Sequence, residues 1–396
     1  MSGKTFRNAV RNRLPSWPAG RIMKKPPVLP LLRRPWEGRI NMSEALPRPA
    51  AAQPRSSSDH TPATFAAIDL GTNNCRLLVG APTPAGSFRV LDSYSRVVRL
   101  GEGLAAHGRL SEGAMERALT ALQTCAQRLL RRPLRRLLAV TTEACRQAKN
   151  GPAFVAAARA ATGLPIRIIS AREEAELAME SCAPLLRTQD RRALLFDIGG
   201  GSTEIAWIRS EGRSAELIGY VSLPLGVVTL AERAGTCCDT PEGFSRVVDE
   251  VAEELACFDR VHSIAREMRA GGVRLMGTSG TVTTLAGVAL ALPRYSRPLV
   301  DGRVLDTEAA DQALRDLFAL GPDGLRAHPC IGPERADFVL PGCAIYAAIR
   351  RVWPCSSVTV ADRGLREGML LRMMRQERRV PRRSSAWYRA AAHPAP

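Results

Sequence analysis

The stretch from Leu194 to Ile208, LLFDIGGGSTEIAWI, predicts a strand, a tight glycine turn and a second strand. Two carboxylates, Asp197 and Glu204, stand on either side of the turn. The turn consists of small and hydroxyl residues: Gly199, Gly200, Gly201, Ser202 and Thr203. Consecutive glycines let the backbone approach a ligand closely, and converging N–H groups bind anions. The pattern therefore predicts a phosphate-binding loop, and the alternative is a plain hairpin with a glycine tip.

A second stretch, from Phe65 to Gly80, FAAIDLGTNNCRLLVG, has the same design. Its first apolar run contains Asp69, and a polar turn follows, with Gly71, Thr72, Asn73 and Asn74. Carboxylate oxygens suit a divalent cation that bridges phosphate oxygens, so Asp69 and Asp197 are candidate metal ligands. Two such hairpins are typical of the actin-like ATPases and sugar kinases. We therefore expect an α/β protein with two actin-like (ribonuclease H-like) domains and a phosphate-binding cleft between them; two coincidental hairpins are the alternative.

A third glycine loop, MGTSGT (276–281), follows a predicted strand from Val273 to Met276 and enters a helix. Its candidate phosphate-binding residues are Gly277, Ser279 and Gly280. The N-terminus of a helix attracts anions, which favours phosphate. An ordinary strand-to-helix turn would have the same sequence.

Two further motifs supply candidate catalytic residues. The segment TTEACRQAKN (141–150) brings Arg146 to the start of a helix, where its guanidinium suits an anion. Ser170 caps a helix predicted from Ala171 to about Leu186, and the first turns of that helix hold three acids, Glu173, Glu174 and Glu176. These acids complement the helix dipole, or one of them faces the cleft as a general base. Their spacing leaves both interpretations open.

The formal charge of +18 gathers at the two ends of the chain. Residues 1–41 hold ten Lys/Arg against one acid, residues 372–396 hold seven Arg against one acid, and residues 65–371 are left with +3. This distribution argues against a specific nucleic-acid partner. Together with the motifs, we expect a disordered basic, proline-rich leader (1–64), a first actin-like domain (65–186), a second (187–371) and a disordered basic tail (372–396). The last helix of the second domain could pack back on the first.

Cysteines and hydropathy bear on the compartment. The ten cysteines include no C-x-x-C pair, so a zinc site is not indicated and a reduced compartment is expected. No apolar run approaches the roughly 18 residues of a membrane span, and the N-terminus lacks the apolar segment of a secretory signal. We therefore expect a cytoplasmic protein without a membrane partner. A start at Met42 is a hypothesis, which a native peptide from residues 1–41 would contradict.

The pattern of apolar residues predicts several helices in the second half. We expect one long amphipathic helix from Pro241 to Met268, helices at about 305–320 and 333–352, and a last helix that begins near Asp362. The segment 294–302 is expected to be a loop.

These motifs together, in this order, resemble the exopolyphosphatase / guanosine pentaphosphate phosphatase (Ppx/GppA) family, in its short two-domain form. The resemblance covers residues 65–371 and rests on IDLGTNN (68–74), RLGEGL (99–104), TTEACRQAKN (141–150), ISAREEA (169–175), FDIGGGSTE (196–204), MGTSGT (276–281) and ADRGLREG (361–368). It implies the actin-like two-domain fold. It also implies hydrolysis of the terminal phosphate of polyphosphate or pppGpp by water with a divalent cation, usually Mg²⁺, and a possible homodimer.

The resemblance assigns roles to particular residues. Glu174 matches the catalytic base, Asp197 the metal-associated aspartate, Glu204 the glutamate of the S-T-E triplet, and Arg146 the arginine of the T-x-x-x-R motif. The phosphate loops match Gly71, Thr72 and Asn73 in the first hairpin and Gly199, Gly200, Gly201 and Ser202 in the second.

The chain departs from the family pattern at two loops. The first usually reads LGSNS, so Asn74 lacks a hydroxyl that bears on substrate positioning. Ala171 replaces a glycine and bears on how the helix of Glu174 begins. A non-catalytic sensor of polyphosphate or alarmone and, less favoured, an ATP-dependent kinase of the same superfamily are the alternatives to a hydrolase. The three acids Glu174, Asp197 and Glu204 favour catalysis, because a binder of polyanions has little use for them.

Overall fold

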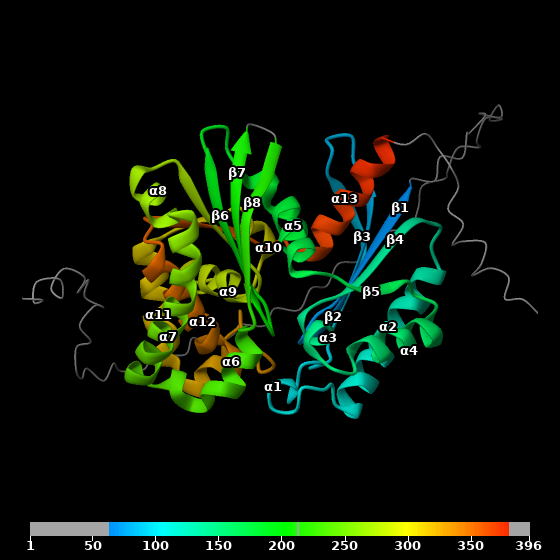
Figure 1. Ribbon diagram of the computed structural model, residues 1–396, viewed down its shortest axis with the longest axis horizontal. Helices are drawn as coiled ribbons and strands as arrows, with labels where there is room; N and C mark the ends of the chain where they lie inside the picture. The colour runs from blue at the N-terminus through cyan, green and yellow to red at the C-terminus, as the bar shows by residue number, and fades with distance from the viewer. Residues whose placement is uncertain (1–62, 212–213, 380–396) are drawn as a thin grey trace, which may run out of the picture. The chain divides into compact units, whose positions relative to one another are not determined.

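The computed structural model describes residues 63–211 and 214–379, and these residues form two β-sheets covered by helices (Figure 1). The first sheet has the order β3-β2-β1-β4-β5 and is built from β1 (Thr64–Leu70), β2 (Asn74–Pro82), β3 (Phe88–Val97), β4 (Leu134–Thr141) and β5 (Ile166–Ile168). The second has the order β10-β11-β9-β6-β7-β8 and is built from β6 (Arg192–Ile198), β7 (Thr203–Glu211), β8 (Ser214–Leu223), β9 (Val273–Thr278), β10 (Val304–Asp306) and β11 (Ser357–Ala361).

The two sheets repeat one topology. In each, three consecutive strands form an antiparallel meander, and the first of them pairs in parallel with a later strand that follows a helical segment. The order β3-β2-β1-β4-β5 in one sheet corresponds to β8-β7-β6-β9-β11 in the other. This duplication confirms the α/β prediction of two actin-like domains.

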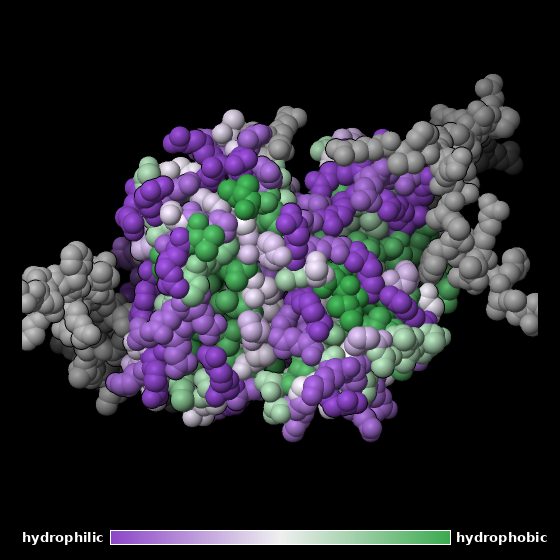
Figure 2. Space-filling model, in the orientation of Figure 1, coloured by the Kyte–Doolittle hydropathy of each residue, from purple (hydrophilic) through white to green (hydrophobic). Residues whose placement is uncertain are grey.

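Helices occupy most of the described sequence outside the strands. Their bounds are α1 (Leu104–His107), α2 (Glu112–Leu130), α3 (Glu143–Gln147), α4 (Gly151–Thr162), α5 (Ala171–Cys182), α6 (Val227–Ala234), α7 (Pro241–His262), α8 (Ile264–Ala270), α9 (Gly280–Ala289), α10 (Arg297–Val300), α11 (Thr307–Ala327), α12 (Ala336–Val352) and α13 (Leu365–Arg379). On the face shown in Figure 2, the outer helices present mainly hydrophilic residues, as expected for helices that cover a sheet. No helix in the described part of the chain is long and apolar enough to cross a membrane.

Each central strand is buried on both faces, because its side chains alternate between two helical layers. In β1, Ile68 and Leu70 pack with α2 and α4, whereas Phe65 and Ala67 pack with α13. In β6, alternate residues pack with α7, α9 and α12 on one face and with α5 on the other. Helix α5 thus follows the first sheet in the chain but covers the second, while α13 covers the first.

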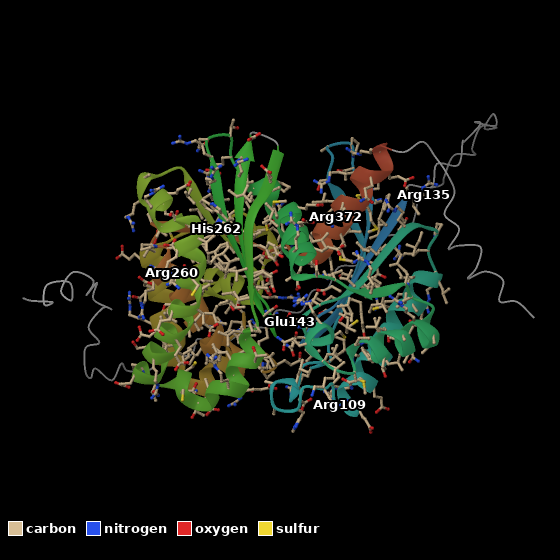
Figure 3. All side chains as sticks on the ribbon, viewed as in Figure 1. Arg109, Arg135, Glu143, Arg260, His262 and Arg372 are labelled. Carbon is tan, nitrogen blue, oxygen red and sulfur yellow. The ribbon has the colours of Figure 1, made fainter. Side chains whose placement is uncertain are left out.

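Helices α5 and α13 lie side by side (Figure 1). A Cβ atom at Gly368 would lie 2.0 Å from the carbonyl oxygen of Leu177, so the two backbones touch where the helices cross. Beside this crossing, Arg372 of α13, labelled in Figure 3, pairs with Glu180 of α5 at 2.7 Å. Helix α13 thus contacts both the first sheet and α5.

Three sequence predictions need correction or lie outside the described residues. The helix expected from Pro241 to Met268 is two helices, because Ser263 adopts a left-handed φ of 52° between α7 and α8. Helix α13 continues to Arg379, beyond residue 372, where the basic tail was expected to begin. The short helix α10 lies within the segment 294–302 that was expected to be a loop. The leader up to residue 62 and the tail beyond residue 379 are not among the described residues.

Candidate active site

The two glycine turns close with the same hydrogen bond. In the β1–β2 hairpin, the N–H of Gly71 donates to the carbonyl oxygen of Asn74 at 2.9 Å. In the β6–β7 hairpin, the N–H of Gly199 donates to the carbonyl oxygen of Ser202 at 2.9 Å. The sequence similarity between the two stretches therefore reflects one turn geometry used twice.

The two turns touch each other at Thr72. A Cβ atom at Gly201 would lie 2.4 Å from Thr72 Oγ1, and one at Gly101 would lie 2.3 Å from Thr72 Cγ2. The N–H of Gly101 also donates to the carbonyl oxygen of Thr72 at 2.9 Å. Because Thr72 belongs to the first sheet and Gly201 to the second, glycine at 201 is what lets the hairpins approach this closely.

A pocket of about 150 Å³, the phosphate pocket, opens between the two hairpins. Twelve of the predicted site residues line it: Asp69, Gly71, Thr72, Asn73, Glu174, Asp197, Gly199, Gly200, Gly201, Ser202, Glu204 and Ser279. A larger pocket of about 440 Å³, the outer pocket, shares several of these residues. Two hairpins, the start of α5 and the β9–α9 loop thus converge on one small cavity, although they are far apart in the sequence.

Three predicted residues lie elsewhere. Gly277 is inside β9, where a Cβ atom would lie 2.2 Å from the ring of Phe196. We assign it to core packing in place of the predicted phosphate contact. Gly280 lines the outer pocket. Arg146 is outside the lining of the phosphate pocket and reaches it through a contact with Glu174.

The carboxylates of the phosphate pocket have raised pKa values. Burial and, less strongly, the neighbouring charge of Asp69 raise the pKa of Asp197 to about 6. Burial also raises the pKa of Asp69, although Arg76, opposite it in the β1–β2 ladder, lowers it. Burial and the charge of Asp197 raise the pKa of Glu204 to about 7. Negative charges are therefore held close together at a cost that a cation would offset.

Two of these carboxylates fit a divalent cation. No group of three or more His, Cys, Asp or Glu side chains in residues 63–211 and 214–379 is placed to hold a metal ion. Mg²⁺, however, commonly takes one or two carboxylates and completes its shell with water and substrate phosphates. Asp69 and Asp197 supply such a pair of oxygen ligands beside the glycine turns. The donor set therefore suits Mg²⁺ that binds together with a phosphate substrate.

Glu174 stands in the first turn of α5 and contacts Arg146. The Ser170 side chain accepts from the N–H of Glu173 at 3.1 Å, so the helix begins with the predicted cap despite Ala171. Arg146 Nη1 donates to Glu174 Oε2 at 3.0 Å. Burial and the charge of Glu204 raise the pKa of Glu174 well above its usual range, while Arg146 lowers it.

Glu143 is a site residue that sequence reasoning missed. It lies in α3, is buried, and pairs with Arg146 through a second short contact; Figure 3 labels it. Arg146 also donates to the carbonyl oxygen of Ile169 at 3.0 Å. The guanidinium is thus held by two carboxylates and a carbonyl, so it orients Glu174. The signal was present in the sequence, since Glu143 and Arg146 are three residues apart on one helix.

Glu204 is fixed by two hydroxyls. Its Oε1 accepts from Ser202 Oγ at 2.5 Å and from Ser222 Oγ at 2.9 Å. Both bonds lower the pKa of Glu204. Ser222 lies on β8, directly opposite Glu204 in the β7–β8 ladder, and no local motif marks it.

Ser279 has an unusual backbone at the entry to α9. Its φ is 77°, a left-handed value that non-glycine residues adopt only when the surrounding structure enforces it. Ser279 lines both pockets, and its side-chain hydrogen bond lowers the pKa of Asp197. The strained turn therefore directs a hydroxyl toward Asp197.

The motif ADRGLREG forms one wall of the phosphate pocket, with Asp362, Arg363, Gly364, Leu365, Arg366 and Glu367. Arg363 Nε lies 3.0 Å from both carboxylate oxygens of Asp301, and the Thr278 hydroxyl donates to the Arg363 carbonyl oxygen. Sequence reasoning used this motif for the family resemblance but assigned it no site residue.

Comparisons with known proteins agree with this geometry. The family model described as the Ppx/GppA phosphatase family matches residues 81–377. A crystal structure of the Aquifex aeolicus member of the Ppx/GppA protein family is 25% identical, with a TM-score of 0.66, and covers 80% of this chain and 98% of its own. An exopolyphosphatase-like protein is 28% identical, with a TM-score of 0.69, over 79% of this chain and 98% of its own. An exopolyphosphatase from Cytophaga hutchinsonii, 22% identical with a TM-score of 0.70, covers 79% of this chain and 98% of its own and shares the fold. The chain is a member of the Ppx/GppA phosphatase family.

Proposed function

We propose that this phosphatase hydrolyses the terminal phosphate of inorganic polyphosphate, of pppGpp, or of both. The observation that carries the proposal is the phosphate pocket, in which two glycine turns face the carboxylate of Glu174 across a small cavity. Backbone N–H groups of such turns bind phosphate oxygens, and a carboxylate beside them can accept a proton.

In the proposed reaction, Glu174 accepts a proton from the attacking water. Its raised pKa makes it a stronger base than an exposed glutamate. Arg146 fixes the orientation of the carboxylate through the 3.0 Å contact between Nη1 and Oε2. The water oxygen forms the new bond to phosphorus while the bond to the bridging oxygen breaks.

The remaining site residues stabilise charge. We expect the N–H groups of Thr72, Asn73, Gly200 and Gly201 to contact the oxygens of the transferred phosphate. The N–H groups of Gly71 and Gly199 already donate within their turns, and the Ser202 hydroxyl donates to Glu204. Asp69 and Asp197 would hold Mg²⁺, which neutralises charge on phosphate oxygens when it is bound. Phosphoryl transfer needs mainly positioning and charge stabilisation, so these groups account for the chemistry.

The outer pocket bears on the choice of substrate. Its wall includes Tyr295, Phe338, Val339 and Arg335, a mixture of apolar, aromatic and cationic groups. A nucleoside with phosphates fits such a surface better than a bare phosphate chain does. This observation supports pppGpp as a second substrate beside polyphosphate.

The experiment is phosphate release with Mg²⁺ from long-chain polyphosphate and from pppGpp, measured in parallel. Glu174→Gln should lower the rate of either reaction about 10²- to 10⁴-fold, because it removes the base and keeps the shape. Glu176→Gln is the matched control: it is the same substitution in the same helix, at a residue that pairs with Arg172 at 2.9 Å. An unimpaired Glu174→Gln enzyme would mean that the base is wrongly assigned.

Assays with the same purified protein distinguish a hydrolase from the two alternative functions, a sensor and a kinase. Tight binding of polyphosphate or pppGpp without turnover would favour a sensor. Labelling of a second substrate that depends on ATP would favour a kinase. The pocket favours the hydrolase, because Glu174, Asp197 and Glu204 all line it and a sensor of polyanions does not need three carboxylates there.

Two further parts of the proposal concern the protein's surroundings. All ten cysteines, which all fall in the described part of the chain, are free, and this supports the reducing cytoplasm as the compartment. A homodimer is proposed from the family resemblance, and sedimentation of the purified protein tests it.

A further inference from the structure

Three arginines line the phosphate pocket, and they differ in what they contact. Arg363 is engaged by Asp301, whose two carboxylate oxygens both lie 3.0 Å from its Nε. For Arg76 and Arg366 there is no carboxylate oxygen within 4.0 Å among the described residues. Two of the three guanidiniums therefore face the pocket without an ion-pair partner.

The guanidinium of Arg366, at the start of α13, has few hydrogen-bond partners. Its Nη1 makes one long contact, 3.5 Å to the carbonyl oxygen of Leu77, although a guanidinium has five N–H donors. The neighbouring acid Glu367 is already used, because it accepts from Arg297 at 3.1 Å and from the N–H of Gly364 at 3.0 Å. Arg366 is partly buried, so water satisfies its donors only in part.

Arg366 also has a cation as a neighbour. Burial lowers the pKa of Arg366, and the charges of Arg76 and Arg297 lower it further, against the opposing charges of Glu367 and Asp69. Asp69 and Glu367 offset this repulsion only in part, since the pKa of Arg366 stays lowered, and an anion bound between the two arginines would offset it further. Their planar donor groups match the oxygens of a phosphate.

The position of this anion follows from the two pockets. Arg76 and Arg366 line both the phosphate pocket and the outer pocket. Glu174, Asp69 and Asp197 line the phosphate pocket but are not among the described residues of the outer pocket. The arginine pair therefore stands where the two pockets meet, next to the proposed position of the reacting phosphate.

We propose that Arg366, assisted by Arg76, binds the second phosphate of the substrate, the one that leaves with the bridging oxygen. The inference rests on the proposed function. When the bond from the terminal phosphorus to the bridging oxygen breaks, that oxygen keeps the electron pair and its phosphate gains negative charge. Arg366 stabilises this charge, while Glu174 holds the proton taken from the attacking water. Arg366 is thus a catalytic residue on the leaving-group side.

The test compares a single phosphate with a short chain. In the Glu174→Gln background, calorimetry measures the binding of orthophosphate and of tripolyphosphate with and without Arg366→Met. The dissociation constant of tripolyphosphate should rise about 10- to 100-fold, the range for a lost charged hydrogen bond, while that of orthophosphate should change less than about threefold. In the active enzyme, Arg366→Lys should recover part of the turnover of tripolyphosphate lost in Arg366→Met.

Arg375→Met is the matched control, because Arg375 lies on the same helix, is exposed, and pairs with Glu180. It should leave both dissociation constants unchanged. If Arg366→Met does not fold, Arg76→Met on β2 makes the same comparison from another element. The inference would be overturned if Arg366→Met weakened the binding of both ligands equally, or if it weakened the binding of neither. If the parent enzyme neither binds nor hydrolyses tripolyphosphate, the proposed function fails instead.

Discussion

Replacing Gly201 with alanine places a methyl group between the two glycine turns. The new Cβ atom would lie 2.4 Å from Thr72 Oγ1, whereas ordinary contact begins at about 3.4 Å. Thr72 cannot turn away, because its Cγ2 already occupies the space beside Gly101, 2.3 Å from where a Cβ would be. The two hairpins must therefore separate by about 1 Å.

A displacement of this size at a phosphoryl-transfer site is costly. Since a misplacement of about 1 Å can lower a rate about 10²-fold, kcat/KM for phosphate release should fall by about that factor in Gly201→Ala. The overpacked contact should also lower the free energy of unfolding by about 1–3 kcal/mol. The assay is phosphate release from tripolyphosphate with Mg²⁺, together with thermal unfolding of each variant.

Two comparisons make this prediction specific. Gly113→Ala on α2 is the control, because its Cβ would have Arg117 Nη1 at 3.5 Å as its nearest neighbour and no clash. Thr72→Ser, added to Gly201→Ala, removes the methyl group beside Gly101, lets the hydroxyl rotate and should recover much of the activity. Activity of Gly201→Ala within about threefold of the wild type, or no recovery with Thr72→Ser, would refute the reasoning.

Three further predictions follow from the site and from the helix crossing. Arg146→Met removes the cation that lowers the pKa of Glu174, so the acidic limb of the pH–rate profile should move to higher pH; an unmoved limb would contradict the contact's role. The pKa of Asp197 is raised to about 6 from an ordinary value of 3.8, so the stability that its protonation contributes is present at low pH and lost as the pH rises through about 6. In EDTA the Tm should therefore fall between about pH 4 and about pH 6, and Mg²⁺ at the higher pH should raise the Tm of the wild type but not of Asp197→Asn. Gly368→Ala places a Cβ atom 2.0 Å from the Leu177 carbonyl oxygen and should lower the free energy of unfolding by at least about 1–3 kcal/mol, which urea titration measures; an unchanged midpoint would show that the helices can part freely.

The parts of the site that sequence could predict are those encoded within one turn of chain. The glycine hairpins carry their turn chemistry in consecutive residues, and Asp69 and Asp197 occupy equivalent positions in them. Gly277 was predicted to lie in a loop because it belongs to MGTSGT (276–281), where small and hydroxyl residues also follow one another. Its true neighbour, Phe196, comes from a different strand, and only the register of β6 with β9 brings the two together.

The residues that sequence reasoning missed depend on tertiary contacts. Ser222 reaches Glu204 across a strand pair, and Asp301 reaches Arg363 from a distant loop. The break at Ser263 was missed because the apolar periodicity continues across it. A single residue with left-handed φ ends one helix without interrupting the sequence pattern. Local pattern thus predicts where the chemistry lies, and packing decides which side chains support it.

The packing of α13 on the first sheet has a consequence for biosynthesis. The ribosome releases β1, β2 and β4 early, but the residues that cover one face of them, from Leu365 to Met374, emerge after every other described helix and strand. Until then Phe65, Leu78 and Val140 stay open to water and to chaperones. A prematurely terminated chain keeps this apolar face and lacks the wall that ADRGLREG supplies. We therefore expect phosphatase activity only from chains translated through that helix.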